Sequence, residues 1–146
     1  METPVNHDNI PSHSTCFACG ISNPIGMSLS FENAGENKIV SEGILGEEYN
    51  GYPGIVQGGV AAVLLDCAMA NCLYKSGLEG VTASLNVKYH KPVKTGVLYK
   101  VSAELTGSKM FMYELSSVIF QEGEKKVSAQ GVFFPYSMAE NSSQNV

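Results

Sequence analysis

The sequence GGVAAVLLDCAMANCLY, residues 58–74, contains no proline and is rich in alanine and leucine. Alanine and leucine are strong helix formers, so this stretch predicts one long helix. Its residues are apolar or small on every side, and only Asp66, Asn71 and the hydroxyl of Tyr74 interrupt that composition. A helix of this kind is expected to be buried nearly all round.

Six shorter segments with strand-like patterns lie around this helix. Residues 27–32 and 38–45 precede it, and the turn-rich residues between them predict a β-hairpin. Four more segments follow the helix, each bounded by glycine, proline or charged turns: residues 81–89, 97–106, 111–121 and 126–134. Short connections favour antiparallel neighbours. The predicted fold class is therefore α+β, with an antiparallel sheet covering one long helix.

Composition limits the kind of protein this is. The chain has 146 residues, of which 44% are hydrophobic, so we expect one domain over residues 1–146, with an ordered core of about 14–136 between polar ends. All nine basic residues are lysines, and the net charge is −5. Arginine makes most bidentate contacts to guanine and phosphate. Its absence and the acidic balance argue against a nucleic-acid partner.

The sequence also argues against a membrane partner. The longest apolar run covers residues 60–65, far short of the roughly 20 residues that span a bilayer. Residues 1–11 contain neither a basic cluster nor an apolar stretch, so they do not resemble a secretory signal. Four cysteines are too few for a disulfide scaffold and fit a reducing compartment. We expect a cytoplasmic protein.

Asp66 is the strongest catalytic candidate. An unpaired carboxylate in an apolar helix is energetically costly, and desolvation raises its pKa. Asp66 must therefore meet a partner, an interface or a cavity. The alternative is a structural bond to a neighbouring strand or to a lysine of another subunit. For Asn71 we favour a hydrogen-bonding role in packing, and for Cys67 and Cys72 a role in filling the core.

Gly58 and Gly59 stand where the helix begins. The first amides of a helix have no acceptor within it, and the helix dipole is positive there. These amides can polarise a carbonyl oxygen, and glycine lets a ligand approach closely. The other interpretation is a tight turn. Eight residues of helix rise about 12 Å, so Gly58 and Asp66 of one chain are too far apart to share one carbonyl. If both act, they meet across a two-fold dimer interface.

Three stretches of the sequence, taken together, match the pattern of a known family. They are CFACGISNPIGMSLSF (residues 16–31), GYPGIVQGGVAAVLLD (51–66) and GVTASLNVKYHKPVKTG (80–96). Together they resemble the hotdog-fold acyl-CoA thioesterases, specifically the PaaI-like group, over about residues 14–135. The resemblance implies a hotdog fold, an antiparallel sheet wrapped around a long central helix. It also implies hydrolysis of acyl- or aryl-CoA thioesters by a homodimer or homotetramer, without a metal or organic cofactor.

The resemblance assigns four catalytic positions. Gly58 supplies the amide that polarises the thioester carbonyl, and Asp66 acts as nucleophile or as general base for water. Thr82, on the strand after the helix, orients that water. Asn50 is the nearest match to a side-chain amide that helps to hold the carbonyl or the water.

Gln57 departs from the family pattern, which usually reads His-Gly-Gly where this chain reads Gln57, Gly58, Gly59. We place Gln57 and Gly59 among the substrate-binding residues. Glutamine does not titrate near neutrality, so any proton transfer by this position is lost. Two alternatives follow. One is a non-catalytic module that binds acyl-CoA. The less favoured one is an enoyl-CoA hydratase or dehydratase, a chemistry that needs a histidine in this fold.

Lys88, Lys91 and Lys94 lie at a strand end and the following turn. They are candidates for contacts with the phosphates of CoA, although lysines in such positions are usually only solvated surface. His90 lies among them. Its place in the alternating pattern predicts a surface-facing side chain and no role as a general base.

Cys16 and Cys19 form a CxxC motif that follows His7 and His13. These four residues are potential zinc ligands. Structural zinc sites normally combine separated ligand pairs rather than one terminal run, so we favour no metal. The preferred interpretation is an entry motif whose reduced thiols pack against the sheet.

Overall fold

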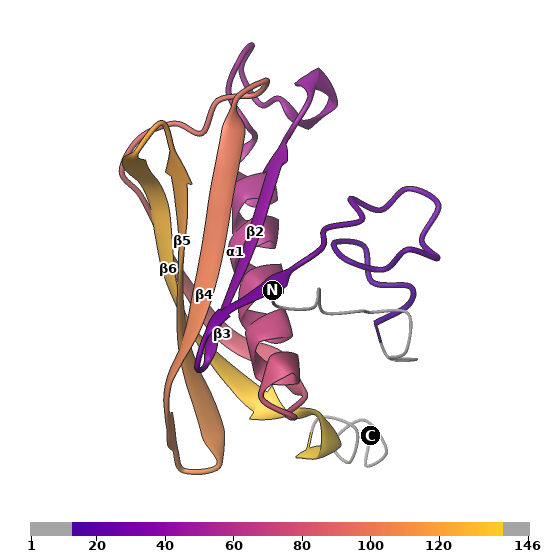
Figure 1. Ribbon diagram of the computed structural model, residues 1–146, viewed down its shortest axis with the longest axis vertical. Helices are drawn as coiled ribbons and strands as arrows, with labels where there is room; N and C mark the ends of the chain where they lie inside the picture. The colour runs from indigo at the N-terminus through magenta and orange to yellow at the C-terminus, as the bar shows by residue number, and fades with distance from the viewer. Residues whose placement is uncertain (1–12, 139–146) are drawn as a thin grey trace.

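One long helix lies against a single antiparallel sheet (Figure 1). The computed structural model describes residues 13–138. Helix α1 covers Gly58–Lys75, so the predicted helix is confirmed to within one residue. The predicted α+β fold class is confirmed as well. Our expectations for the two polar ends fall mostly outside the described residues and stay predictions.

The sheet has six strands in the order β1-β2-β4-β5-β6-β3, and every neighbouring pair is antiparallel. The four strands predicted after the helix are confirmed, with bounds that differ by a few residues. Strands β1 and β3 form the two edges of the sheet. The strand bounds are β1 Glu32–Gly35, β2 Lys38–Ile44, β3 Gly80–Tyr89, β4 Leu98–Lys109, β5 Met112–Gln121 and β6 Glu124–Pro135.

The prediction of a strand at residues 27–32 is wrong. A short strand begins only at Glu32, because the amides of Met27 and Leu29 bond to the carbonyls of Phe17 and Ala18 instead of to β2. Ser28 between them has a φ of 53°, which breaks the extended conformation. The hairpin itself exists, shifted toward the C-terminus. The apolar residues of this segment pack against the core instead of forming a ladder.

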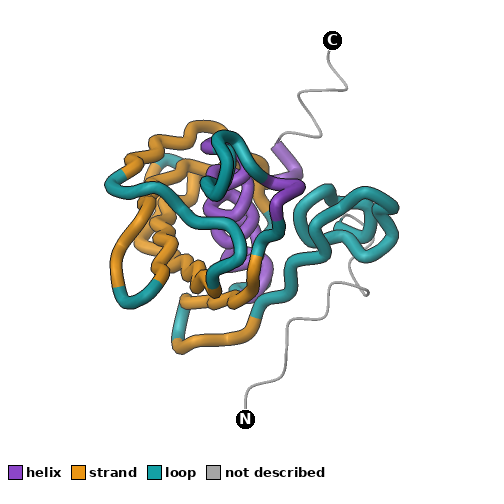
Figure 2. The backbone as a smooth tube through the Cα atoms, turned by 90° about the horizontal axis from the view of Figure 1, so that it is seen from above, coloured by secondary structure: helices purple, strands orange, loops and turns teal. Residues whose placement is uncertain are grey.

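The sheet curves around α1, as the view from above shows (Figure 2). Nine of the eighteen helix residues are buried. They meet the inward side chains of the sheet, among them Ile39, Val101, Ile119 and Phe133. The prediction that α1 is buried nearly all round is therefore too strong for a single chain. A stripe containing Ala62, Val63, Asp66 and Ala70 is only half-buried within this chain.

The segment before β1 packs beside the helix (Figures 1 and 2). Ala18, Cys19 and Phe31 of this segment are buried in the same apolar cluster as the helix.

The structure contains no candidate membrane-spanning helix among residues 13–138.

Gln121 at the end of β5 holds the loop that connects β3 to β4. Its Oε1 accepts a hydrogen bond from the Lys94 amide at 2.8 Å. Its Nε2 donates to the carbonyls of Lys94 at 2.9 Å and Val97 at 3.2 Å. Because Gln121 is only 2% exposed, these backbone groups depend on it for their partners.

We predict that Gln121→Leu lowers the free energy of unfolding by about 1–3 kcal/mol, the usual cost of leaving buried polar groups without partners. Urea denaturation measures this change. Gln130→Leu is the matched control, because Gln130 is exposed on β6 and should change the free energy by less than about 0.5 kcal/mol. Equal losses in both variants would contradict the role given to Gln121.

Candidate active site

The Asp66 side chain has a hydrogen-bonding partner on the neighbouring strand. The hydroxyl of Thr82 in β3 donates to Asp66 Oδ1 at 2.6 Å. Asp66 lies in the third turn of α1, on the half-buried stripe of the helix. The structure thus brings together two of the four predicted catalytic residues.

A bulge in β3 turns Thr82 toward the helix. Leu85 and Val87 pack on the core side of the strand, and strict alternation would place Ala83, not Thr82, on that side. The register between β3 and β6 shifts between Thr82 and Ser84, so Ala83 has no partner in β6. One extra residue changes the phase of the strand. Thr82 therefore faces Asp66.

Burial controls the charge state of Asp66. Desolvation raises the pKa of its carboxyl above the ordinary value, and the hydrogen bond from Thr82 partly opposes that rise. A thiolate at Cys16 would add to the rise. A carboxylate with a raised pKa is a better proton acceptor than an exposed one, which suits a general base.

The start of α1 presents free amides. Gln57 is the N-cap, and its Oε1 accepts a hydrogen bond from the Val60 amide at 3.1 Å. The amides of Gly58 and Gly59 have no acceptor among the described residues. A Cβ on Gly59 would come within 2.8 Å of Gln57 Oε1, so a larger residue there would displace the capping side chain from its present position. Two exposed donors are left at the positive end of the helix.

Tyr89 was not identified from the sequence. Its hydroxyl donates to the Gly58 carbonyl at 2.6 Å, which ties the end of β3 to the start of α1. The alternation of residues in β3 does indicate that Tyr89 faces the helix side of the sheet, because Tyr89 shares a face of the strand with Val87. Its contact with Gly58 was not predictable, because the two residues are 31 positions apart.

A groove of about 640 Å³ opens at the start of α1. This is within the usual range of small-molecule sites, about 300–1,000 Å³. Gly58 lines the groove but Asp66 does not, so the two halves of the predicted site are separate in one chain. The lining comes from the loop before the helix, its first turn and the end of β3: Tyr52, Ile55, Gln57, Ala61, Tyr89 and Lys91 are among them.

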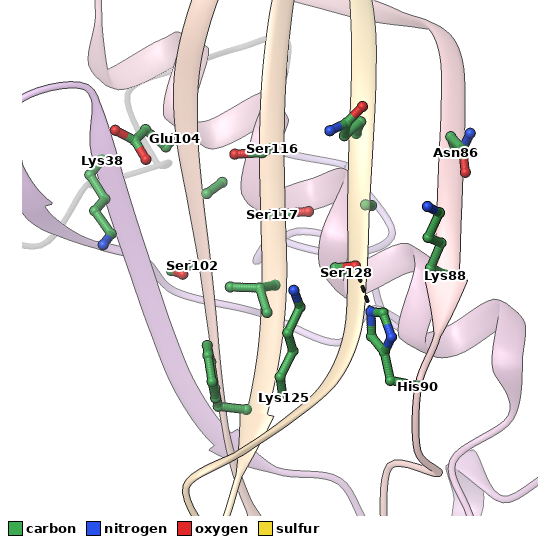
Figure 3. Close-up of a pocket in the computed structure, with 15 residues that line it drawn as sticks. Lys38, Asn86, Lys88, His90, Ser102, Glu104, Ser116, Ser117, Lys125 and Ser128 are labelled. Carbon is green, nitrogen blue, oxygen red and sulfur yellow. Dashed lines mark hydrogen bonds between the residues drawn. The ribbon is translucent and has the colours of Figure 1, made fainter.

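The three candidate lysines lie in different surroundings. Lys91 lines the groove, and its Nζ lies 2.9 Å from Glu124 Oε2. Lys88 lies on the opposite, outer face of the sheet, near His90 (Figure 3). Lys94 Nζ lies 3.9 Å from an oxygen of Glu122. Within one chain, only Lys91 of the three therefore adjoins the groove.

The structure confirms the prediction for His90 and leaves the prediction for Asn50 open. His90 is exposed, as predicted, and its Nε2 lies 2.9 Å from Ser128 Oγ. Asn50 follows the short helix η2 (Glu47–Tyr49) and pairs with Val56 in an isolated bridge. Its Oδ1 is buried and has no hydrogen-bond partner among the described residues. Asn50 is not part of the groove lining, so its catalytic role stays a prediction.

Comparison with known proteins identifies the family to which this chain belongs. The sequence profile described as thioesterase superfamily matches residues 53–127, which include α1, β3, β4 and β5. The chain belongs to the thioesterase superfamily. The match contains Asp66, Thr82 and the Gln57–Gly59 segment.

Curated relatives in this superfamily include acyl-coenzyme A thioesterase THEM4 of Rattus norvegicus, 32% identical over 103 residues, and that of Bos taurus, 28% identical over 105 residues. These alignments cover 68% and 69% of this chain. The chain spans 43% of the length of each of these relatives.

Solved structures support the same superfamily fold. A thioesterase superfamily protein has a TM-score of 0.78 at 25% identity, covering 83% of this chain and 60% of that one. A hypothetical thioesterase from Streptococcus pneumoniae, solved with coenzyme A, has a TM-score of 0.68 at 19% identity, covering 73% and 84%. Thioesterase superfamily member 2 of Mus musculus has 0.66 at 20% identity, covering 72% and 80%. The predicted hotdog fold is confirmed.

We predict that Thr82→Val raises the pKa of Asp66 further, because the hydrogen bond that favours the charged carboxylate is lost. A pH titration of the Asp66 carboxyl carbon by ¹³C NMR measures this pKa. Ser84→Ala removes the next hydroxyl along β3 and should leave the titration unchanged. If Thr82→Val lowers the pKa of Asp66 or leaves it unchanged, the assigned hydrogen bond is wrong.

Proposed function

We propose that this chain hydrolyses acyl- or aryl-CoA thioesters to the free acid and CoA. The observation that carries this proposal is the half-buried Asp66 carboxylate bonded to Thr82, together with the free amides at the start of α1. Thioester hydrolysis needs a base or nucleophile, and donors for the oxyanion. Relatives that bear the name acyl-coenzyme A thioesterase support this choice of reaction.

Solved neighbours support the choice of substrate. The Streptococcus pneumoniae protein was solved with coenzyme A, and a Streptococcus mutans protein with a TM-score of 0.68 was solved with acetyl-CoA. Crystal structures of two alanine variants of the pneumococcal protein replace an aspartate and a threonine whose positions differ by 16. Asp66 and Thr82 have the same spacing.

The proposed reaction assigns each group one step. The thioester carbonyl oxygen accepts a hydrogen bond from the Gly58 amide at the positive end of the helix. The Asp66 carboxylate removes a proton from a water held by the Thr82 hydroxyl, and the water oxygen attacks the carbonyl carbon. The C–S bond then breaks, the CoA thiolate leaves, and the proton passes from Asp66 to sulfur. In the alternative, Asp66 attacks the carbonyl directly and water hydrolyses the resulting anhydride.

The proposed site lies between two subunits. Gly58 and Asp66 of one chain are separated by about 12 Å of helix, so each site would take Gly58 from one subunit and Asp66 with Thr82 from the other. Strand β3 is a sheet edge, and its Val81 is 40% exposed. Small residues beside Asp66, Ala62 and Ala70, leave room for a second helix. A dimer, or a tetramer made of two such dimers, would cover both surfaces.

Two rival functions remain alternatives. Gln57 has no titratable group, which favours a module that binds acyl-CoA without hydrolysing it. Hydration of enoyl-CoA is the weaker rival, since it calls for a histidine at that position. We also propose a cytoplasmic location and membership in the PaaI-like group. The four cysteines form no disulfide with one another, an arrangement that fits a reducing compartment.

We predict that Asp66→Asn lowers kcat for thioester hydrolysis at least about a hundredfold, the effect expected when an acid-base group is removed. Thiol release from short, long and aromatic acyl-CoAs measures turnover, after correction for the protein's own thiols. Glu104→Gln, on the outer face of the sheet, is the matched control and should retain activity. If the wild type releases no thiol but binds acyl-CoA, the binding-module interpretation replaces ours.

We predict that two inactive variants restore activity when they share a dimer. Gly58→Pro removes the proposed oxyanion amide, and proline is tolerated at the first helical position. Gln57 before it has φ −57° and ψ 135°, a conformation that fits the residue before proline. Co-expressed Gly58→Pro and Asp66→Asn chains should recover about a quarter of wild-type activity, because half the dimers are mixed and hold one intact site. No recovery in purified mixed dimers would contradict the shared site.

A further inference from the structure

The Tyr89 hydroxyl bonds to a peptide group that carries one of the free amides of α1. It donates to the Gly58 carbonyl oxygen at 2.6 Å, near the short end of the range for O–H···O hydrogen bonds. That carbonyl and the Gly59 N–H are the two ends of one planar peptide bond. A hydrogen bond to the oxygen polarises the peptide, so the N–H at its other end becomes a stronger donor. The Tyr89 hydroxyl therefore acts on the Gly59 amide through the peptide bond.

The neighbouring peptide is polarised from within the helix. The Gly58 N–H belongs to the peptide that carries the Gln57 carbonyl. This carbonyl accepts hydrogen bonds from the amides of Val60 at 2.9 Å and Ala61 at 3.2 Å, as a helix normally provides at its first residue. The bond from Tyr89 differs because it comes from another element, β3. Both free amides at the start of α1 thus belong to peptides whose carbonyl oxygens accept hydrogen bonds.

The end of β3 fixes the position of the Tyr89 ring. Tyr89 pairs with Val127 of β6 in the last step of the ladder. The next two amides, those of His90 and Lys91, both donate to the Lys126 carbonyl, at 2.9 Å and 3.0 Å. The phenol is therefore carried by backbone that the sheet holds on both sides of Tyr89. A side chain on such a rigid element can place its hydroxyl precisely enough to orient a functional group.

The Tyr89 ring lies beside Gly58 and borders the groove. A Cβ on Gly58 would lie 3.6 Å from the phenol oxygen and 3.7 Å from two ring carbons. Tyr89 is 54% exposed and lines the groove together with Gly58. Burial of the ring therefore contributes little to the core, and its hydroxyl makes its contact where a ligand would approach the helix. This placement favours a role in the groove over a purely structural one.

We propose that Tyr89 is a positioning residue, which holds and polarises the Gly58–Gly59 peptide so that the Gly59 amide becomes a second donor to the thioester oxyanion. The inference rests on the proposed hydrolysis, which assigns this oxygen to the Gly58 amide alone. The first N–H groups of a helix point in the same direction along its axis, so one oxygen can accept from both. Negative charge develops on that oxygen in the transition state, where a stronger donor lowers the barrier.

NMR of the unliganded protein tests the polarisation without any substrate. Selective ¹⁵N-glycine labelling reports the amide proton shifts of Gly58 and Gly59. Tyr89→Phe keeps the ring and removes the hydroxyl, so the Gly59 proton should move upfield by more than the Gly58 proton moves. Tyr136→Phe is the matched control, because Tyr136 is 43% exposed and does not line the groove. It should move neither proton. A Gly59 proton that stays in place in Tyr89→Phe, or moves no more than that of Gly58, overturns the proposal.

Steady-state kinetics of thiol release tests the role in catalysis. One oxyanion donor contributes about 10²–10³ in kcat, and polarisation strengthens a hydrogen bond by about 10–30%. Tyr89→Phe should therefore lower kcat about two- to eightfold and leave KM unchanged, because the affected bond forms in the transition state. Tyr136→Phe should retain both constants. An unchanged kcat, or a change in KM alone, overturns the positioning role. Absence of turnover in the wild type overturns the proposed hydrolysis instead, and the amide shifts then decide the polarisation by themselves.

Discussion

The desolvation of one carboxylate constrains the rest of this structure. Asp66 lies in an otherwise apolar helix, and within the described chain its side chain has one hydrogen bond, from Thr82. Its pKa is raised in the folded chain, so the folded state binds a proton more tightly than the unfolded state does. The stabilising contribution of this proton is present at low pH and is lost as the pH rises through the folded pKa. Near neutrality Asp66 therefore costs stability, and a group retained at such a cost is expected to serve function.

Helix α1 and strand β3 have to be held in one register for that carboxylate to be useful. Two contacts fix this register near the two ends of β3, Thr82 with Asp66 and Tyr89 with Gly58. The residue numbers of these partners rise along the helix and fall along the strand, so the two elements run in opposite directions. The bulge at Ala83 makes both contacts possible, because without it the phase that turns Tyr89 inward would turn Thr82 away. The catalytic geometry thus depends on one residue that is without a partner in the ladder.

Local patterns predicted what local forces control. The proline-free run of good helix formers predicted α1 to within one residue, and β-branched segments predicted five of the six strands. The strand at residues 27–32 was wrong because its amides found acceptors in a segment ten residues earlier, which no pattern within the strand could reveal. The contacts of Gln121 and Tyr89 join positions far apart in the chain. A single sequence gives the residue types but does not show which distant residues contact one another. The predicted site therefore contained the right helix but not the side chains that hold its surroundings in place.

Gln57, which departs from the family pattern, and the two glycines after it together determine which amides are free at the start of α1. Its amide oxygen caps the Val60 amide and leaves those of Gly58 and Gly59 free, and the absence of a Cβ at Gly59 gives that oxygen its place. A histidine in this position would accept a hydrogen bond only while neutral, because a protonated imidazole has no acceptor. An amide has no such limit. The donors at the start of α1 therefore keep one geometry across the pH range, and Asp66 is left as the group in the proposed site whose titration sets the pH dependence.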